Sequence, residues 1–208
     1  IKTSSGSSRI MSKRYVTYLG SVEEFKKFIW TAAVKEGYGR IKHVVVLGDG
    51  ARWIWNLVEE LFPDVSACIL DYYHFSENVH EFAKFLYPED EVSRKRWVKK
   101  TIDLIMEEKF DEALKIIKER TSKNLPRGLV NLYNYVNENK KRMYYERFRA
   151  KGYYIGSGPV ECGHKVVVHQ RMKQAGMRWS LKGAQHIAAL RAKHESDLWD
   201  EVVDVITA

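Results

Sequence analysis

The sequence predicts an α/β fold that carries an all-helical insertion. Two short apolar runs, residues 44–47 and 67–70, have the length and composition of buried strands. A helical pattern follows each run after a short link, which implies that the two strands pair in parallel through a right-handed crossover. From residue 89 to 149, apolar residues recur at helical spacing without a clear strand, so this region is predicted to be helical.

The elements around the two strands follow from local patterns. Residues 14–20 alternate and are rich in β formers, which favours another strand, and a helix is expected over 21–36. Apolar spacing predicts a helix over 52–62. A further helix is expected over 75–86, with Ser76 as its N-cap.

The carboxy-terminal part is expected to return to the core after the helical region. Residues 156–158 form a glycine-rich turn, and Pro159 suits the first turn of a helix that reaches about residue 174. The last helix follows Ser180. The predicted organisation has four segments. Residues 1–13 are a linker or truncated start, and residues 14–88 are a partial α/β core. Residues 89–150 are a helical insertion, and residues 151–208 return to the core and end in basic helices.

Basic residues gather in one part of the chain. The formal net charge is +8, and between residues 140 and 193 thirteen Lys or Arg residues stand against two acids. Such a tract is typical of a protein that binds a polyanion, although a solvated basic face is the alternative. Two cysteines fit a reducing compartment, and no apolar run is long enough to span a membrane, so a cytoplasmic location is expected.

Three acids stand at positions suited to chemistry. Asp49 and Asp71 directly follow the predicted strands, and Glu161 lies in the first turn of a predicted helix. Carboxylates at the ends of parallel strands can hold Mg²⁺ or Mn²⁺ for phosphodiester chemistry. His74 lies close enough to Asp71 for a hydrogen bond to it or for shared support of a metal ligand shell. For each acid, an ordinary turn or capping role is the alternative.

A second set of residues favours DNA binding. Five of them lie within the basic tract, where cations would contact phosphates and an indole would stack or pack in the core: Lys165, Arg171, Lys173, Arg178 and Trp179. Helical spacing places Glu161, His164, Lys165, Val168 and Arg171 on one face. A zinc site made of Cys68, His74, Cys162 and His164 is disfavoured because the spacing of these residues matches no common zinc motif.

Several ordered motifs resemble bacterial insertion-sequence transposases of the Kra type, and also those of the Lre type and, more distantly, the Mutator-like group. The motifs are Gly48-Asp49-Gly50, Asp71-Tyr72-Tyr73-His74, Gly156-Ser157-Gly158-Pro159-Val160-Glu161 and Gly176-Met177-Arg178-Trp179-Ser180. The resemblance implies a ribonuclease H-like core, an Asp-Asp-Glu triad with Mg²⁺ or Mn²⁺, and a helical insertion before the glutamate. It also implies binding to element ends and target DNA, a nucleoid-associated location, and a homo-oligomer when the protein is full length.

On this resemblance Asp49 matches the second catalytic aspartate and Glu161 the glutamate, both as metal ligands. Asp71 and His74 match an auxiliary acid-x-x-His motif. No aspartate precedes Asp49 in the sequence, so the first catalytic aspartate and its strand are expected upstream, and this chain is expected to be inactive alone.

Two other functions remain open. The first is a non-catalytic DNA-binding remnant or repurposed transposase. The second is an α/β phosphohydrolase that uses Asp49 and Asp71, although the sequence lacks a standard phosphate-binding glycine loop.

Overall fold

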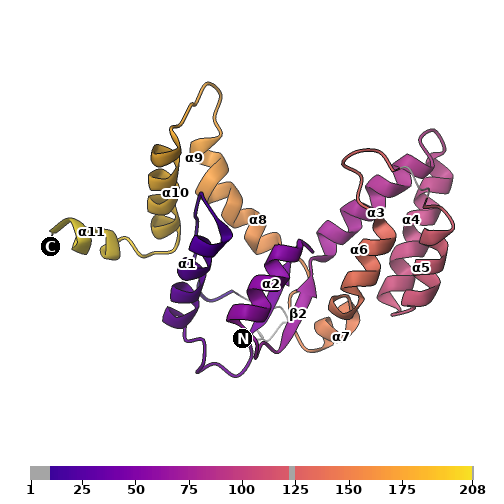
Figure 1. Ribbon diagram of the computed structural model, residues 1–208, viewed down its shortest axis with the longest axis horizontal. Helices are drawn as coiled ribbons and strands as arrows, with labels where there is room; N and C mark the ends of the chain where they lie inside the picture. Colours follow the sequence, from indigo (N-terminus) through magenta and orange to yellow (C-terminus); the bar gives the residue numbers. More distant parts are fainter. Residues whose placement is uncertain (1–9, 122–124, 208) are drawn as a thin grey trace. The chain divides into compact units, whose positions relative to one another are not determined.

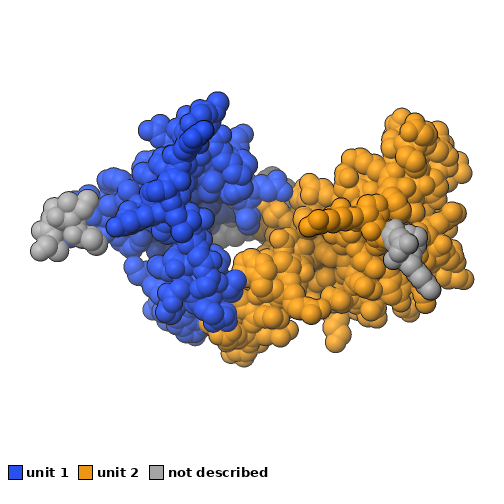
Figure 2. Space-filling view, turned by 45° about the horizontal axis from the view of Figure 1, so that its top comes forward, with its two compact units in different colours: residues 1–42, 158–208 blue, residues 43–157 orange. Residues whose placement is uncertain are grey.

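The chain forms two compact units. The computed structural model describes residues 10–121 and 125–207. Unit 1 combines residues 1–42 with 158–208, and unit 2 is the continuous segment 43–157 (Figure 2). The predicted helical insertion therefore belongs to the same unit as both predicted strands.

Unit 2 begins with a strand–helix–strand–helix sequence. The elements are β1 (Val45–Gly48), α2 (Arg52–Leu61), β2 (Ala67–Leu70) and α3 (Tyr72–Leu86). The two strands pair in parallel, with Val45 opposite Ala67 and Gly48 opposite Leu70. The predicted parallel pairing is confirmed, and the unit is α/β at this coarse level.

The rest of unit 2 is helical, as predicted. It contains α4 (Glu91–Met106), α5 (Phe110–Lys118), α6 (Leu132–Asn139), the 3₁₀ turn η1 (Lys140–Arg142) and α7 (Tyr145–Ala150). Helix α3 packs on α4 and α6, and α5 packs on both α4 and α6 (Figure 1). Fully buried side chains from the sheet, from α3 and from the later helices form the core of the unit: Ile69, Leu70, Phe75, Phe82, Ile105, Ile117, Leu132 and Tyr145.

Unit 1 is helical in its described part. It contains α1 (Val22–Lys35), α8 (Gly158–His164), the π-helical turn η2 (Lys165–His169), α9 (Gln170–Met172), α10 (Leu181–Glu195) and α11 (Asp200–Thr207). Ser21 and Ser180 cap α1 and α10 through their hydroxyl groups, which accept from the Glu24 and Gly183 amides. The predicted helices at 21–36, 159–174 and after Ser180 are confirmed, with a π turn inside the second. None of the helices described is long and apolar enough to cross a membrane.

The strand predicted over residues 14–20 does not form. The Tyr15 amide donates to the Ser196 hydroxyl, at 2.8 Å, and the Leu19 amide donates to the side-chain oxygen of Gln185. Backbone donors that would bind a neighbouring strand are thus satisfied by side chains in and just after α10. The β-forming residues keep an extended segment but have no strand beside them.

The predicted N-cap of α3 is also wrong. The helix begins at Tyr72, and its N-cap is Asp71 rather than Ser76. The Asp71 carboxylate accepts hydrogen bonds from the Tyr73 and His74 amides. An acid directly after the strand therefore starts the helix as soon as the strand ends.

Candidate functional site

The carboxyl ends of β1 and β2 bring Asp49 and Asp71 to one edge of the sheet. Gly48 and Leu70 are opposite each other in the parallel register, and each precedes one of the two acids. The Asp71 amide donates to the Gly48 carbonyl at 2.7 Å, which extends the pairing by one residue. The sequence prediction that these acids follow paired strands is therefore confirmed.

Asp71 is a buried carboxylate whose two oxygens both bind backbone amides. Its side chain is almost inaccessible, with 3 % relative exposure for the residue. Oδ1 accepts from the Tyr73 amide at 2.8 Å and the His74 amide at 3.4 Å, and Oδ2 accepts from the Ser157 amide at 3.1 Å. Asp71 thus caps α3 and fixes the turn that contains Ser157, which is the structural role that its position allowed.

The imidazole of His74 lies toward its own helix rather than on the Asp71 carboxylate. Nδ1 of His74 is 3.7 Å from Oε2 of Glu77, one turn later in α3. Asp71 contacts His74 through the backbone amide. Asp71 and His74 are in contact, as the sequence predicted. The contact joins the Asp71 carboxylate to the main-chain N–H of His74 and does not involve the imidazole.

Asp49 is the exposed acid of the edge. Its Oδ1 accepts from the Ala51 amide at 2.8 Å, and its backbone carbonyl accepts from the Tyr135 hydroxyl at 3.0 Å. Within residues 10–121 and 125–207, Oδ2 of Asp49 has no hydrogen bond. This oxygen is available to a ligand, and a half-bound carboxylate is suited to a hard cation.

Tyr135 is part of this edge and was missed from the sequence. Its ring lies against Gly50, where an added Cβ would come within 2.7 Å of Cε2 of Tyr135 and 2.9 Å of Cδ1 of Leu70. Burial raises the pKa of the Tyr135 phenol, and the negative charges of Asp49 and Asp71 raise it further. The hydroxyl therefore stays protonated and donates. Its spacing from Leu132 and Val136 on one face of α6 was the signal that could have found it.

Glu161 belongs to unit 1, in the first turn of α8. It is exposed and lines a hollow of about 630 Å³ together with Lys165 and His169. The structure therefore groups the predicted site residues into an Asp49–Asp71–His74 edge in unit 2 and a Glu161 hollow in unit 1. The described residues include no cluster of three or more His, Cys, Asp or Glu side chains suited to a metal ion.

The π turn changes the predicted face of the 158–172 helix. Its additional residue brings the His164 and His169 rings to 4.4 Å between centroids, at a separation of five residues. Lys165 stays beside Glu161, whereas Val168 and His164 line an apolar groove with residues 10–17. The prediction that Glu161, His164, Lys165, Val168 and Arg171 share one face assumed regular α-helical spacing throughout. The π turn over Lys165–His169 breaks that spacing before Val168 and Arg171.

Arg191 holds the π turn in place. Its guanidinium donates from Nε to the Val166 and Val167 carbonyls, at 3.1 and 3.0 Å, and also pairs with Glu195. A π turn leaves a carbonyl without its usual helical donor, and the arginine from α10 supplies one. This basic residue of the tract has a structural role.

The five predicted DNA-binding residues lie in or just after η2 and α9, before α10 begins. Lys165, Arg171 and Arg178 are exposed and form no ion pair within the described part of the chain. Lys173 lies 3.1 Å from the His169 ring. Trp179 is 40 % exposed and donates its indole N–H to the Met172 carbonyl, which closes the 172–179 turn. It is therefore only partly packed.

Comparisons of the chain with family models, curated proteins and solved structures find no match. The chain's own residues supply a carboxylate edge on unit 2 and an exposed glutamate on unit 1. Among the residues that the structure describes, one Asp49 oxygen has no hydrogen bond, and Lys165 beside Glu161 has no ion pair.

Proposed function

We propose that this chain is a carboxy-terminal part of the catalytic region of a DNA transposase resembling the Kra and Lre types. The observation that carries the proposal is the sheet edge, where the parallel strands end at Asp49 and Asp71, and where one Asp49 oxygen has no hydrogen bond to the described residues. Ligand groups of α/β proteins are commonly placed at this edge of a parallel sheet.

A ribonuclease H-like core is part of the proposal. β1 pairs with β2 along one side, and no described strand lies on its other side. Parallel sheets are usually larger and covered on both faces. A strand carrying the first catalytic aspartate would pair with this open side of β1, and residues 1–48 contain no aspartate that could serve instead.

Asp49 and Glu161 would hold Mg²⁺ or Mn²⁺ together with the upstream aspartate. Their carboxylate oxygens are the ligands that these ions prefer, and the bound metal would polarise the phosphodiester and activate the attacking oxygen. Because two ligands bind such ions weakly, the chain alone is expected to be inactive. The exposed cations Lys165, Arg171 and Arg178, which form no ion pair with any described residue, support DNA as the partner.

The test is a strand-transfer assay with labelled DNA ends, combined with calorimetric titration of Mn²⁺. We expect neither activity nor tight metal binding from the chain alone. Both should appear when the chain is extended upstream in its gene to include the first aspartate. Asp49→Asn should abolish both in the extended chain, and Asp64→Asn, on an exposed turn, should change neither.

Two outcomes would contradict parts of this proposal. Strand transfer by the chain alone, lost in Asp49→Asn, would show that no upstream aspartate is needed. An extended chain with no carboxylate-dependent Mn²⁺ site would favour a DNA-binding protein without catalysis. The saturation of Asp71 by three backbone amides is the observation that favours this alternative.

A further inference from the structure

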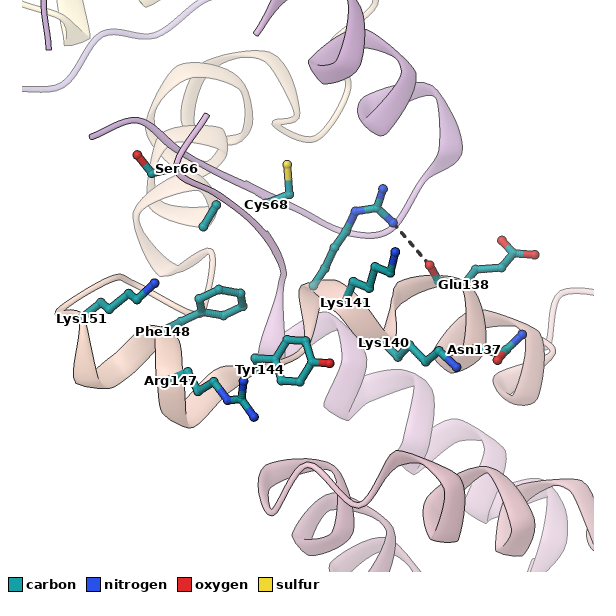
Figure 3. Close-up of a pocket in the computed structure, with 12 residues that line it drawn as sticks. Ser66, Cys68, Asn137, Glu138, Lys140, Lys141, Tyr144, Arg147, Phe148 and Lys151 are labelled. Carbon is teal, nitrogen blue, oxygen red and sulfur yellow. Dashed lines mark hydrogen bonds between the residues drawn. The ribbon is translucent and has the colours of Figure 1, made fainter. Parts of the chain in front are cut away.

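A second site lies near the amino end of β2, away from Asp71. A pocket of about 640 Å³ is lined by residues 66–68, by the end of α6, by η1 and by α7 (Figure 3). All its lining residues belong to unit 2. A strand rises about 3.3 Å per residue, so Cys68 and Asp71 are about 10 Å apart along β2. The pocket is therefore distinct from the carboxylate edge.

Basic side chains dominate the lining. Five cations and one carboxylate, Glu138, contribute to it, and the cations are Lys140, Lys141, Arg142, Arg147 and Lys151. The Glu138 carboxylate lies 3.8 Å from Arg52 of α2. The one acid of the pocket thus has a cationic partner outside the lining.

The two arginines are held by neighbours. The Arg142 guanidinium lies over the Trp55 ring, 4.4 Å from its centroid, and donates to the Asn139 side chain. Arg147 forms two hydrogen bonds to the Glu108 carboxylate, with Nε 2.7 Å from Oε1. Among the described residues Arg142 has no acidic partner, whereas Arg147 is paired with Glu108.

The three lysines have no such partners. Within the residues that the structure describes, Lys140, Lys141 and Lys151 form no ion pair. Figure 3 shows Lys151 on one side of Phe148 and Lys141 on the other. Ammonium groups that surround a concave surface create a positive potential that an anion would neutralise.

Two aromatic rings lie between these lysines (Figure 3). Tyr144 is fixed by Phe110, with ring centroids 5.3 Å apart, and by Arg147 over its face at 4.7 Å. The Phe148 ring is half-buried, lines the pocket, and has no ring or cation contact with the described residues. A partly exposed aromatic face beside cations is the arrangement on which nucleic-acid bases stack while their phosphates are bound.

We propose that this pocket binds a nucleotide unit, with the phosphate between Lys141 and Lys151 and the base against Phe148. Its volume is within the ordinary range of small-ligand sites, about 300–1,000 Å³. The nucleotide comes from a nucleic-acid strand or from solution, and both sources offer the same phosphate and base. The site involves neither Asp49 nor Glu161, so it is independent of the proposed metal chemistry.

Cys68 provides a local reporter for the test. It lines the pocket, whereas Cys162, the other cysteine, is exposed in unit 1 and serves as the internal reference. The alkylation rate of each thiol with N-ethylmaleimide is followed by mass spectrometry, with hexathymidylate, thymidine monophosphate or inorganic phosphate added. A ligand at about ten times its Kd should slow Cys68 alkylation about tenfold by occupancy.

Substitutions then locate the ligand groups. Lys141→Gln with Lys151→Gln should weaken protection of Cys68 and lower the magnitude of the salt slope of hexathymidylate binding by about 0.7, because the two lysines share one phosphate contact. Phe148→Leu should weaken nucleotide protection more than any phosphate protection. The control, Lys100→Gln with Lys115→Gln, removes the same charge from exposed lysines of unit 2 outside the pocket, which form no ion pair within the described part of the chain. Each variant is compared with its own ligand-free rate.

The outcomes decide the proposal and the source of the nucleotide. Protection by hexathymidylate alone supports a nucleic-acid strand, and protection by the monophosphate supports a free nucleotide. Absence of protection, or protection that survives loss of both lysines, overturns the proposal. Equal protection by inorganic phosphate, unchanged in Phe148→Leu, would show a simple anion site and also overturn it.

Discussion

Asp71 shows how one buried carboxylate can determine local geometry. Asp71→Ala removes the N-cap of α3 and leaves the Ser157 amide without its acceptor. We expect a loss of about 2–3 kcal/mol in the stability of unit 2, from the cap and from the unsatisfied amide. The measurement is hydrogen exchange at the Tyr73 and Ser157 amides, which should become faster in Asp71→Ala. Asp64→Ala is the control, and equal exchange in both variants would contradict the role of Asp71.

Gly50 is required by both backbone conformation and space. Its φ is +97°, and a Cβ there would meet Tyr135 and Leu70. Gly50→Ala should therefore cost about 1–3 kcal/mol from backbone strain and a similar amount from overpacking. Gly128→Ala is a matched control, since its φ is +93° and nothing lies within 4 Å of the added Cβ. Chemical denaturation should show a larger loss of unfolding free energy in Gly50→Ala than in Gly128→Ala. Equal losses in the two variants would show that crowding by Tyr135 and Leu70 makes no contribution.

At the scale of elements, Arg191 joins the π turn to α10. Arg191→Met removes the donors to the Val166 and Val167 carbonyls. We expect faster hydrogen exchange over residues 165–172, because the carbonyls lose their partner and the two helices lose a contact. Lys182→Met, at an exposed α10 position with no ion pair among the described residues, should leave these amides unchanged. If both variants exchange as the wild type does, the π turn does not depend on Arg191.

Glu201 of α11 belongs to an ion cluster with Lys35 and Lys193 that acid should break. Hydrogen bonds from Lys193 and Lys35 hold the pKa of Glu201 at about 2, below its ordinary 4.5. A lowered folded-state pKa stabilises the fold above pH 4.5, and the stabilisation is lost as the pH falls toward 2. Carboxyl NMR titration should show the low pKa in the wild type and a higher one in Lys193→Met. Asp200→Asn is the control and should leave the Glu201 pKa low. A Glu201 pKa near 4.5 in the wild type would contradict this ion cluster.

The sequence predicted those elements whose signal is local. The strands at 45–48 and 67–70 and most helices were found because apolar spacing and caps act within a few residues. Residues 14–20 were assigned wrongly because a strand needs a partner, and their amides bind side chains more than 160 residues away. The π turn was missed because Arg191, which holds it, is distant in sequence. In the candidate site, both aspartates were found, whereas Tyr135 needed the tertiary structure.

At the scale of the whole molecule, charge should govern binding to DNA. Arg171→Gln with Arg178→Gln removes two exposed cations of unit 1 that have no ion pair among residues 10–121 and 125–207. The slope of log affinity for duplex DNA against log salt concentration should fall in magnitude by about 1.8, at about 0.9 per lost contact. Fluorescence anisotropy over a salt series measures it, with Lys100→Gln and Lys115→Gln as the matched control. An unchanged slope would show that duplex DNA does not bind at these arginines.

The division of the chain into two units also sets an order of events during synthesis. Unit 2 is one continuous segment, so every residue that forms its internal contacts is available once residue 157 has left the ribosome. Unit 1 needs residues 158–208 as well, and at about 5–20 residues per second its amino-terminal segment waits several seconds for them. During that interval Tyr15 and Leu19 lack the acceptors that Ser196 and Gln185 later provide. Translation that stops near residue 157 would therefore yield the complete unit 2, attached to an amino-terminal segment whose Tyr15 and Leu19 amides lack the acceptors that they bind in the full chain.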